Sequence, residues 1–474
     1  MRRARLATVL AVVGILLFGG AASALRDAPP TMAPRFITDD EGRALLLRGL
    51  NTASSAKSTP DGLPILDESE VEREYRDMGT NVVRFLLQWR TVEPEPGAYD
   101  DTYLAKVAER VEWYGDRGYH VILDMHQDLY GGAITPEGNV GNGAPDWATE
   151  MEGLPVGKQD QWEFYYLEPG VIRAFDNFWG TGDAATDLMR RYADAWGHVA
   201  EYFADDDTVL GYDLMNEPWG GSVQATAFEN GPLAALYETC IDRIRRVDEN
   251  GWIFLEPQAV GVNWGLPSSL PVFDDPRPGE DRIVFAPHLY PLPMDLGGHY
   301  DGDGKAPVDT TVGWWRDNVL RVAQRWNAPV FLGEFGLDAT QPGGLDFVDK
   351  IADIADTAGM GWAYWSSDPG PWGPYGGNGE RQPLVSTLDR AYPRAIAGTP
   401  TLIEYDADAL RLSVAFTSVD GVTAPTEIYL PDVFGNGGTV DCGACTVSFD
   451  PDTRILSVTT DPTVGEHSIV VTTR

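Results

Sequence analysis

The 474-residue chain is 43% hydrophobic and 23% charged, which is typical of a soluble globular protein with one large and one small domain, or with a few domains of medium size. Its formal net charge is −37 at pH 7. This charge argues against binding to nucleic acid and against electrostatic docking on anionic membranes, because both of those partners are themselves negative.

The N-terminus has the pattern of a secretory signal peptide. A positively charged start precedes an apolar run from Leu6 to Gly20, and Ala22-Ser23-Ala24 offers a small-residue cleavage site. We therefore expect residues 1–24 to be removed near Ala24 and the mature protein to be secreted. The apolar run is short for a membrane span, so an uncleaved anchor is the less favoured alternative.

Eight short apolar runs, most of them separated by helix-like stretches, fill the first four-fifths of the chain. They span residues 45–51, 81–87, 120–126, 209–217, 252–256, 282–290, 329–334 and 360–365. Near-continuous apolar strands alternating with helices are typical of a parallel sheet that is covered on its faces. The pattern predicts an α/β fold, a (β/α)8 TIM barrel over residues 25–398, with a doubly wound sheet as the alternative. The barrel is favoured because polar residues follow nearly all eight strands, and only a closed barrel gathers those strand ends on one face.

The sequence pattern changes after about Gly398. Short β-rich runs separated by Gly, Pro and Asp turns predict a small antiparallel β-sandwich over residues 399–474. No long linker precedes it, so we expect it to pack rigidly on the barrel as a brace or interface module. Cys442 and Cys445 are spaced for a small disulfide in an exported chain, whereas Cys240 falls on an apolar helical stripe and is expected in the core.

The longest insertion follows the third strand and covers residues 127–184. It shows no strong periodicity and is rich in glycine and aromatic residues, among them Tyr130, Trp162 and Trp179. Loops of this length in a compact domain are usually functional. Because it follows a barrel strand, we expect it to lie over the catalytic face.

Two glutamates stand at strand ends. Glu217 occurs in Asn216-Glu217-Pro218 after the fourth strand, and Glu334 occurs in Gly333-Glu334-Phe335-Gly336 on the seventh. Those strands face each other across an eight-stranded mouth, and a pair of carboxylates about 5 Å apart is the machinery of a retaining glycosidase. We expect Glu334 to be the nucleophile and Glu217 the general acid and base. A structural ion pair is the alternative for either residue taken alone.

Other strand-end residues can support this pair. We expect Arg84 to pair with Glu334, Tyr290 to donate a hydrogen bond to Glu334, and His288 to lie near Glu217. Asn216 is placed to bind a sugar 2-hydroxyl. His126 and Asp128 would face the sugar at the non-reducing side, and Trp365 would form a stacking floor beneath it. For a single His or Trp a core position is the ordinary interpretation, and the shared placement at strand ends favours function.

No metal or cofactor is expected. The histidines and carboxylates lack a His-Glu-x-x-His helix or a clear third ligand, and the chain shows no nucleophile elbow, phosphate-binding loop or dinucleotide fingerprint at a strand-to-helix turn.

Together these residues resemble the active-site set of glycoside hydrolase family 5, a cellulase-like group with its two glutamates on strands four and seven. The set consists of Arg84, His126, Asn216-Glu217-Pro218, His288, Tyr290, Glu334 and Trp365. Asp124-Met125-His126-Gln127-Asp128, the loop from Asn51 to Lys57 and the all-β tail are more narrowly similar to secreted actinobacterial endoglycoceramidases.

The resemblance implies hydrolysis of the bond between oligosaccharide and ceramide in glycosphingolipids. It assigns sugar contacts to Lys57, Asp128, Trp162 and Trp365, and implies no cofactor. The aromatic insertion and the apolar run from Leu289 to Leu296 suit a lipid, so we expect transient contact with lipid surfaces or micelles, by a monomer. Two alternatives stay open: a hydrolase of the same family acting on soluble glycans, and a secreted glycan- or lipid-binding protein without catalysis.

Overall fold

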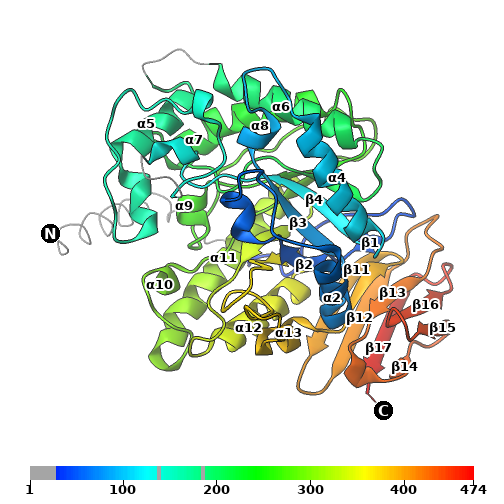
Figure 1. Ribbon diagram of the computed structural model, residues 1–474. Coiled ribbons are helices and arrows are strands. Elements are labelled where there is room, and N and C mark those ends of the chain that lie inside the picture. Colours follow the sequence, from blue (N-terminus) through cyan, green and yellow to red (C-terminus); the bar gives the residue numbers. More distant parts are fainter. Residues whose placement is uncertain (1–27, 136–139, 183–186, 474) are drawn as a thin grey trace.

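The computed structural model describes residues 28–135, 140–182 and 187–473, and the predicted signal peptide lies outside them. The described chain forms a barrel and a β-sandwich that lie side by side (Figure 1). None of the described helices combines the length and the apolar character that crossing a bilayer requires.

The barrel is built as the sequence predicts. Within the described residues its eight parallel strands follow the sheet order β7-β6-β5-β4-β3-β2-β9-β8. Bridges from Phe285 to Val330 and from Leu289 to Phe335 close the ring between β7 and β8. The strands are β2 (Arg48–Asn51), β3 (Val82–Leu87), β4 (His120–Met125), β5 (Val209–Asp213), β6 (Trp252–Leu255), β7 (Ile283–Phe285), β8 (Phe331–Phe335) and β9 (Gly361–Tyr364). Each lies within one of the eight predicted apolar runs or overlaps it, and the barrel is confirmed.

Long helices surround the barrel: α2 (Glu68–Met78), α4 (Asp101–Gly115), α6 (Leu188–Phe203), α8 (Ala234–Ile244), α11 (Lys305–Trp326) and α12 (Gly344–Thr357). Their boundaries have local causes. Asp67 and Glu70 form a capping box at the start of α2, and Gly79 ends that helix in the left-handed conformation. Helix α4 buries Val107, Val111 and their neighbours in a stripe against the sheet.

Shorter helices lie in the connections: α3 (Trp89–Val92), α5 (Pro169–Phe178), α7 (Ala225–Phe228), α9 (Ala259–Val262), α10 (Leu292–Asp295) and α13 (Pro383–Leu388). Helix α5 lies inside the aromatic insertion, where no strong periodicity is expected. Its buried apolar residues Val171, Ala174, Phe175 and Phe178 nevertheless recur at helical spacing, so this part of the insertion is more regular than predicted.

The inside of the barrel changes from apolar to charged along the strands. Val82 and Ile122 belong to an apolar cluster at the N-terminal ends of the strands. Two residues later on the same strands lie Arg84 and Asp124, both fully buried. Because a strand returns to the same face every second residue, the charged layer lies directly above the apolar one.

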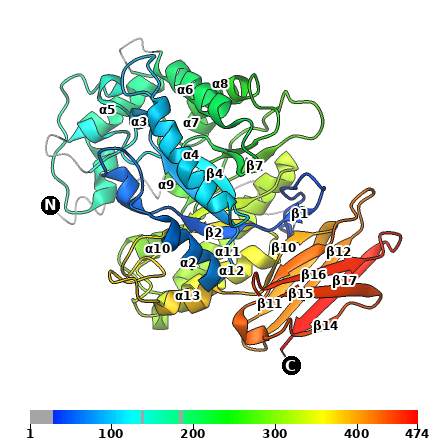
Figure 2. The ribbon, with the colours of Figure 1, turned by 45° about the vertical axis from the view of Figure 1, so that its right-hand side comes forward.

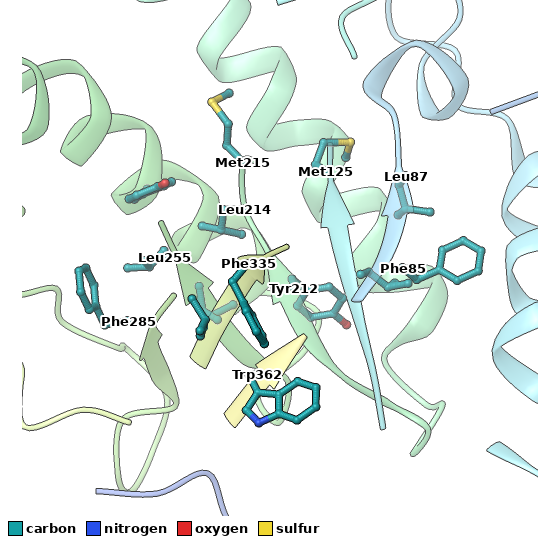
Figure 3. Packing of buried hydrophobic residues seen from close by; sticks show 14 of the residues in the cluster. Phe85, Leu87, Met125, Tyr212, Leu214, Met215, Leu255, Phe285, Phe335 and Trp362 are labelled. Carbon is teal, nitrogen blue, oxygen red and sulfur yellow. The ribbon is translucent and has the colours of Figure 1, made fainter. Parts of the chain in front are cut away.

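The outward faces of the strands form a second apolar layer against the helices. Phe85, Tyr212, Leu255 and Phe335 come from four different strands and are all buried in one cluster, as Figure 3 shows. Apolar packing therefore holds the strands on both sides of the sheet and fixes the height at which the charged layer begins.

The sandwich consists of two antiparallel sheets. One has the order β1-β10-β13-β16-β15 and the other β11-β12-β17-β14. Its strands are β1 (Ala44–Leu45), β10 (Tyr392–Ile396), β11 (Thr399–Asp406), β12 (Arg411–Thr417), β13 (Thr426–Tyr429), β14 (Thr439–Asp441), β15 (Cys445–Asp450), β16 (Ile455–Thr460) and β17 (Glu466–Thr472). Residue 398 separates β10 from β11, so two strands that precede it also pair within the sandwich. Cys442 and Cys445 form a disulfide, and Cys240 is buried in the barrel core.

The sandwich packs on the N-terminal ends of the barrel strands, and β1 and β10 lie at the junction in Figure 2. The hydroxyl of Tyr392 donates to the carbonyl of Gly79 at 2.8 Å, just before β3 begins. Arg48, at the start of β2, lies over the Tyr392 ring and forms a buried ion pair with Asp356. The site residues lie at the opposite end of the barrel, at or after the C-terminal ends of the strands.

Replacing Gly79 by alanine tests this junction. Gly79 has a φ of +57°, and an added Cβ would collide with the ring of Tyr429. The left-handed backbone should cost about 1–2 kcal/mol once a side chain is present, and overpacking should add about 1–3 kcal/mol. We expect Gly79→Ala to lower the midpoint of thermal unfolding well below that of Gly118→Ala. Gly118 is the matched control because it has a φ of +69° with open space around it. Equal shifts would contradict a tight junction.

Candidate active site

The two glutamates predicted from the sequence meet above the charged layer. Glu334 lies on β8 and is 4% exposed, and Glu217 lies in the loop that follows β5. One carboxylate oxygen of each, together with a ring nitrogen of His288, lie within 4.8 Å of one another. This separation fits the spacing of about 5 Å at which one carboxylate attacks a sugar and the other transfers a proton.

Arg84 is the centre of the charged layer. Its Nη1 donates to Glu334 Oε1 at 2.8 Å and its Nη2 donates to Asn216 Oδ1 at 2.9 Å. Three further carboxylates surround the same guanidinium at 2.8–3.0 Å: Asp124, Asp213 and Glu256. The guanidinium therefore supplies the cation within a carboxylate cluster that could otherwise hold a metal ion.

These buried charges shift one another's pKa values. Burial would lower the pKa of Arg84, but the surrounding carboxylates, Asp124 and Asp213 foremost, raise it well above its ordinary value. Burial and the charge of Glu256 raise the pKa of Asp213 well above its usual range, although Arg84 opposes the shift.

Glu334 is held at both carboxylate oxygens. Arg84 donates to Oε1, and the hydroxyl of Tyr290 donates to Oε2 at 2.9 Å. Burial raises the pKa of Glu334 above its ordinary value, and the positive charges of His288 and Arg84 oppose the shift only in part. Both contacts aim the carboxylate into the space beside Glu217.

Glu217 has a different setting. Its Oε1 accepts a hydrogen bond from Asn263 Nδ2 at 2.8 Å and lies 3.1 Å from His288 Nδ1. Its backbone has a φ of +44°, a region that residues with a side chain rarely adopt. Side-chain contacts hold this backbone: Gln127 Nε2 donates to the carbonyls of Asn216 and Glu217 at 2.8 and 3.0 Å.

His288 joins the two glutamates to the layer beneath. Its Nδ1 lies near both of them, and its Nε2 lies 3.2 Å from Glu256 Oε1. Burial would lower its pKa, but the charges of Glu256 and Glu334 raise it well above the ordinary value for histidine. The surrounding carboxylates therefore favour the protonated ring.

A polar cluster lies beside the pair, on the loops of β2, β4 and β9. Lys57 Nζ lies 2.8 Å from Asp128 Oδ2 and 4.1 Å from the centre of the Trp365 ring. His126 stacks on Trp365 at 5.5 Å, and its Nδ1 donates to the carboxylate of Asp124 at 2.7 Å. The Lys57 charge and His126 hold the pKa of Asp128 far below its usual range, against the effect of burial. Ion pairs beside an aromatic face suit the hydroxyls and the ring of a sugar.

The opposite side of the site is apolar. A cavity of about 640 Å³ opens above the glutamates. The loops after β5, β6 and β7 contribute this part of its wall: Trp219, Ala259, Val260, Trp264, Leu292 and Leu296. Asp295 is a polar residue in this part of the wall. Burial raises its pKa to about 8, and its side-chain oxygen accepts a hydrogen bond from Trp264 Nε1 at 3.1 Å.

Four exposed apolar side chains form the edge of this cavity, and we call them the apolar rim. They are Trp162 (38% exposed), Leu167 (48%), Leu296 (51%) and Trp372 (42%). Trp162 and Leu167 come from the aromatic insertion, as expected. Most other aromatic residues of the insertion, such as Phe175 and Trp179, are buried in the core instead. Leu289, which the sequence placed in a lipid-facing run, is also buried in the core because it pairs with β8.

The structure brings together all the residues selected from the sequence. Lys57, Asp128, Trp162, Glu217, Tyr290, Glu334 and Trp365 line the cavity. Arg84, His126, Asn216 and His288 lie buried beneath it.

Four contributors were not selected: Gln127, Glu256, Asn263 and Asp295. Glu256 had a signal, because it ends an apolar strand run as Glu334 does. Asn263 and Asp295 lie in connections whose sequence does not show which way their side chains face.

Comparisons with known proteins agree with this geometry. Residues 38–370 match the cellulase family, glycosyl hydrolase family 5, and residues 390–471 match the glycoside hydrolase family 5 C-terminal domain. Endoglycoceramidase I of Rhodococcus hoagii (strain 103S) is 30% identical over 443 residues, which cover 90% of this chain and 84% of that protein.

Solved structures extend the likeness. The ganglioside GM3 complex of endo-glycoceramidase II from Rhodococcus sp. is 52% identical with a TM-score of 0.90. A lactosyl-enzyme intermediate of the same protein is 51% identical with a TM-score of 0.88. Both matches cover 93% of this chain and 100% of the solved one. With the family match spanning the barrel and its site, this chain belongs to glycoside hydrolase family 5.

Proposed function

We propose that this protein is a retaining endo-β-glycosidase that hydrolyses the linkage between oligosaccharide and ceramide in glycosphingolipids. One observation carries the proposal: a carboxylate pair within 4.8 Å lies between a polar cluster and an apolar wall in a single cavity. The relatives named as endoglycoceramidases support the same substrate class.

The geometry fits a double-displacement reaction. Glu334, ionised and held by Arg84 and Tyr290, attacks the anomeric carbon. The bond from that carbon to the ceramide oxygen breaks as Glu217 gives its proton to that oxygen, and ceramide leaves as an alcohol. Glu217 then takes a proton from water, which attacks the anomeric carbon of the glycosyl ester and frees both the glycan and Glu334.

The position of Glu217 tells which side of the cavity receives the leaving group. A general acid must contact the oxygen that departs, so the leaving group lies beside Glu217. The loops on that side carry Val260, Leu292 and Leu296, whereas the ion pairs of Lys57 and Asp128 lie across the mouth. A soluble glycan would place hydroxyls against this apolar wall, and a ceramide would place hydrocarbon there. Asp295 lies where the amide or hydroxyl of a ceramide could find a partner.

A glycolipid panel with product identification tests the substrate. Incubation with lactosylceramide and gangliosides should yield intact oligosaccharide and free ceramide. Cellulose and soluble β-glucans should yield no comparable product, because their leaving groups bring no apolar surface to the cavity. Release of sugar from the soluble glycans alone would favour the endoglucanase alternative, and binding without any released sugar would favour a non-catalytic protein.

Substitution of the two glutamates tests the mechanism. Glu334→Gln keeps the side-chain shape and removes the attacking charge, so turnover should fall by orders of magnitude with the fold intact. Glu217→Gln should lower turnover of glycolipid by about 10²–10⁴-fold, the usual contribution of general acid–base catalysis. With 2,4-dinitrophenyl β-lactoside, whose leaving group departs without a proton, azide should accelerate the Glu217 variant by attacking the glycosyl ester to give a β-lactosyl azide, and it should leave the Glu334 variant inactive. Full activity of Glu334→Gln would exclude it as the nucleophile.

We further propose that the apolar rim touches the surface of lipid aggregates while the substrate enters. The four side chains surround the entrance through which hydrocarbon has to pass, and large exposed apolar side chains gathered at one opening are a sign of such contact. The net charge of −37 makes electrostatic attraction to anionic lipid unfavourable, so the contact suits neutral lipid.

A double variant of the rim tests this contact. Trp372→Ser combined with Leu296→Ser removes apolar surface that a bilayer would cover, and should lower turnover of lactosylceramide in phosphatidylcholine vesicles by roughly tenfold. Hydrolysis of a soluble aryl lactoside should fall much less. Tyr202→Ser is the control, since Tyr202 is 39% exposed on α6 near the start of β5, at the other end of the barrel. Equal effects on both substrates would contradict docking through the rim.

We also propose that the protein is secreted and that it is a monomer. The signal-peptide pattern of residues 1–24 supports export, and the disulfide between Cys442 and Cys445 suits an oxidising compartment.

A further inference from the structure

Glu256 contacts the backbone of Glu217, and it contacts Arg84 and His288, which lie against the catalytic pair. It follows β6 and is 2% exposed. Its Oε2 accepts the backbone N–H of Glu217 at 2.8 Å. Its Oε1 accepts from Arg84 Nη2 at 2.9 Å and lies 3.2 Å from His288 Nε2. The family resemblance does not include this residue.

The backbone contact matters because Glu217 is held in an unfavourable conformation. A side-chain-bearing residue at a φ of +44° needs its surroundings to maintain it. Glu256 holds the N–H of Glu217, and Gln127 holds the carbonyls of Asn216 and Glu217. The peptide units on both sides of the glutamate are thus fixed by two side chains from different strands.

A second route runs through the imidazole. His288 spans from Glu256 at Nε2 to the Glu217 carboxylate at Nδ1. The negative charge of Glu256 lies beside Nε2, and the ring faces the oxygen of Glu217 that Asn263 also contacts. Glu256 therefore acts on the position of Glu217 through its main chain and on its carboxylate through His288.

We propose that Glu256 is a positioning residue for the proton transfers performed by Glu217. This inference rests on the proposed function, in which Glu217 is the general acid and base. It predicts that loss of the Glu256 charge will impair departure of leaving groups that need a proton. Departure of leaving groups that are stable as anions should be affected much less.

The test uses the full-length Glu256→Gln variant with two soluble substrates, phenyl β-lactoside and 2,4-dinitrophenyl β-lactoside. Phenolate departs faster when it is protonated, and dinitrophenolate does not need the proton. We expect kcat/KM for the phenyl lactoside to fall by about 10²-fold. The pre-steady-state burst of dinitrophenolate should slow by less than about tenfold, because this leaving group departs without receiving a proton from Glu217.

Asp213→Asn is the matched control. Asp213 accepts from Arg84 Nε at 2.8 Å, as Glu256 does from Nη2, but it has no hydrogen bond to Glu217 or His288 within the described part of the chain. Its effect, whatever its size, should be the same for both lactosides. If Glu256→Gln also lowers both rates by one common factor, or lowers neither, Glu256 does not position the acid.

A second variant guards against a folding defect, which thermal unfolding of each protein would reveal. Gln127→Leu removes the other restraint on the same backbone and should show the same selective loss on the phenyl lactoside. Both substrates lack ceramide, so the two hypotheses fail separately. If the wild-type protein cleaves these lactosides but not lactosylceramide, the glycolipid substrate is refuted. The comparison of the two lactosides still tests the role of Glu256.

Discussion

The site depends on one buried guanidinium. Arg84 has no exposed surface, and a charge in that position is tolerated only when it is paired and fully hydrogen-bonded. The carboxylates that meet this requirement come from β4, β5, β8 and the end of β6, so a single side chain ties together strands around the ring. Glu334 is one of these partners, and its orientation is a by-product of satisfying Arg84. The same contacts therefore set the catalytic geometry and stabilise the charged layer of the barrel.

The loops above this layer divide the mouth into two kinds of surface. Loops from one arc of strands bring Lys57, Asp128 and Trp365 together, and loops from the other arc bring Val260, Leu292 and Leu296. The buried layer sets the chemistry at the boundary between them. A barrel can thus keep one reaction and change its substrate by altering one arc, because the catalytic pair does not depend on which groups line that arc.

Much of this could be predicted from the sequence, for physical reasons. Strands covered on both faces must be apolar along their length, so all eight barrel strands stood out, and the polar residues that end them had to share one face. What depends on three-dimensional curvature stayed hidden. Glu256 ends a recognised strand, but its contact with the Glu217 backbone exists only because β5 and β6 are neighbours in a closed ring. Helix α5 has apolar residues at helical spacing, but the pattern is short and lies within a long, glycine-rich insertion, so it does not stand out. Strands β1 and β14 are too short to show alternation.

Strand β1 pairs with a strand that is synthesised much later, β10. Ala44 and Leu45 pair with β10, whose partner β13 comes later still in the chain. During synthesis the lead-in to the first barrel strand therefore has only its local bridge to Thr38 until β10 has been made. Contacts of such long sequence separation form slowly, because the chain must first close a very large loop. Removing the C-terminal strands would leave this segment with an open edge, so the two domains should fold as a single cooperative unit rather than one after the other.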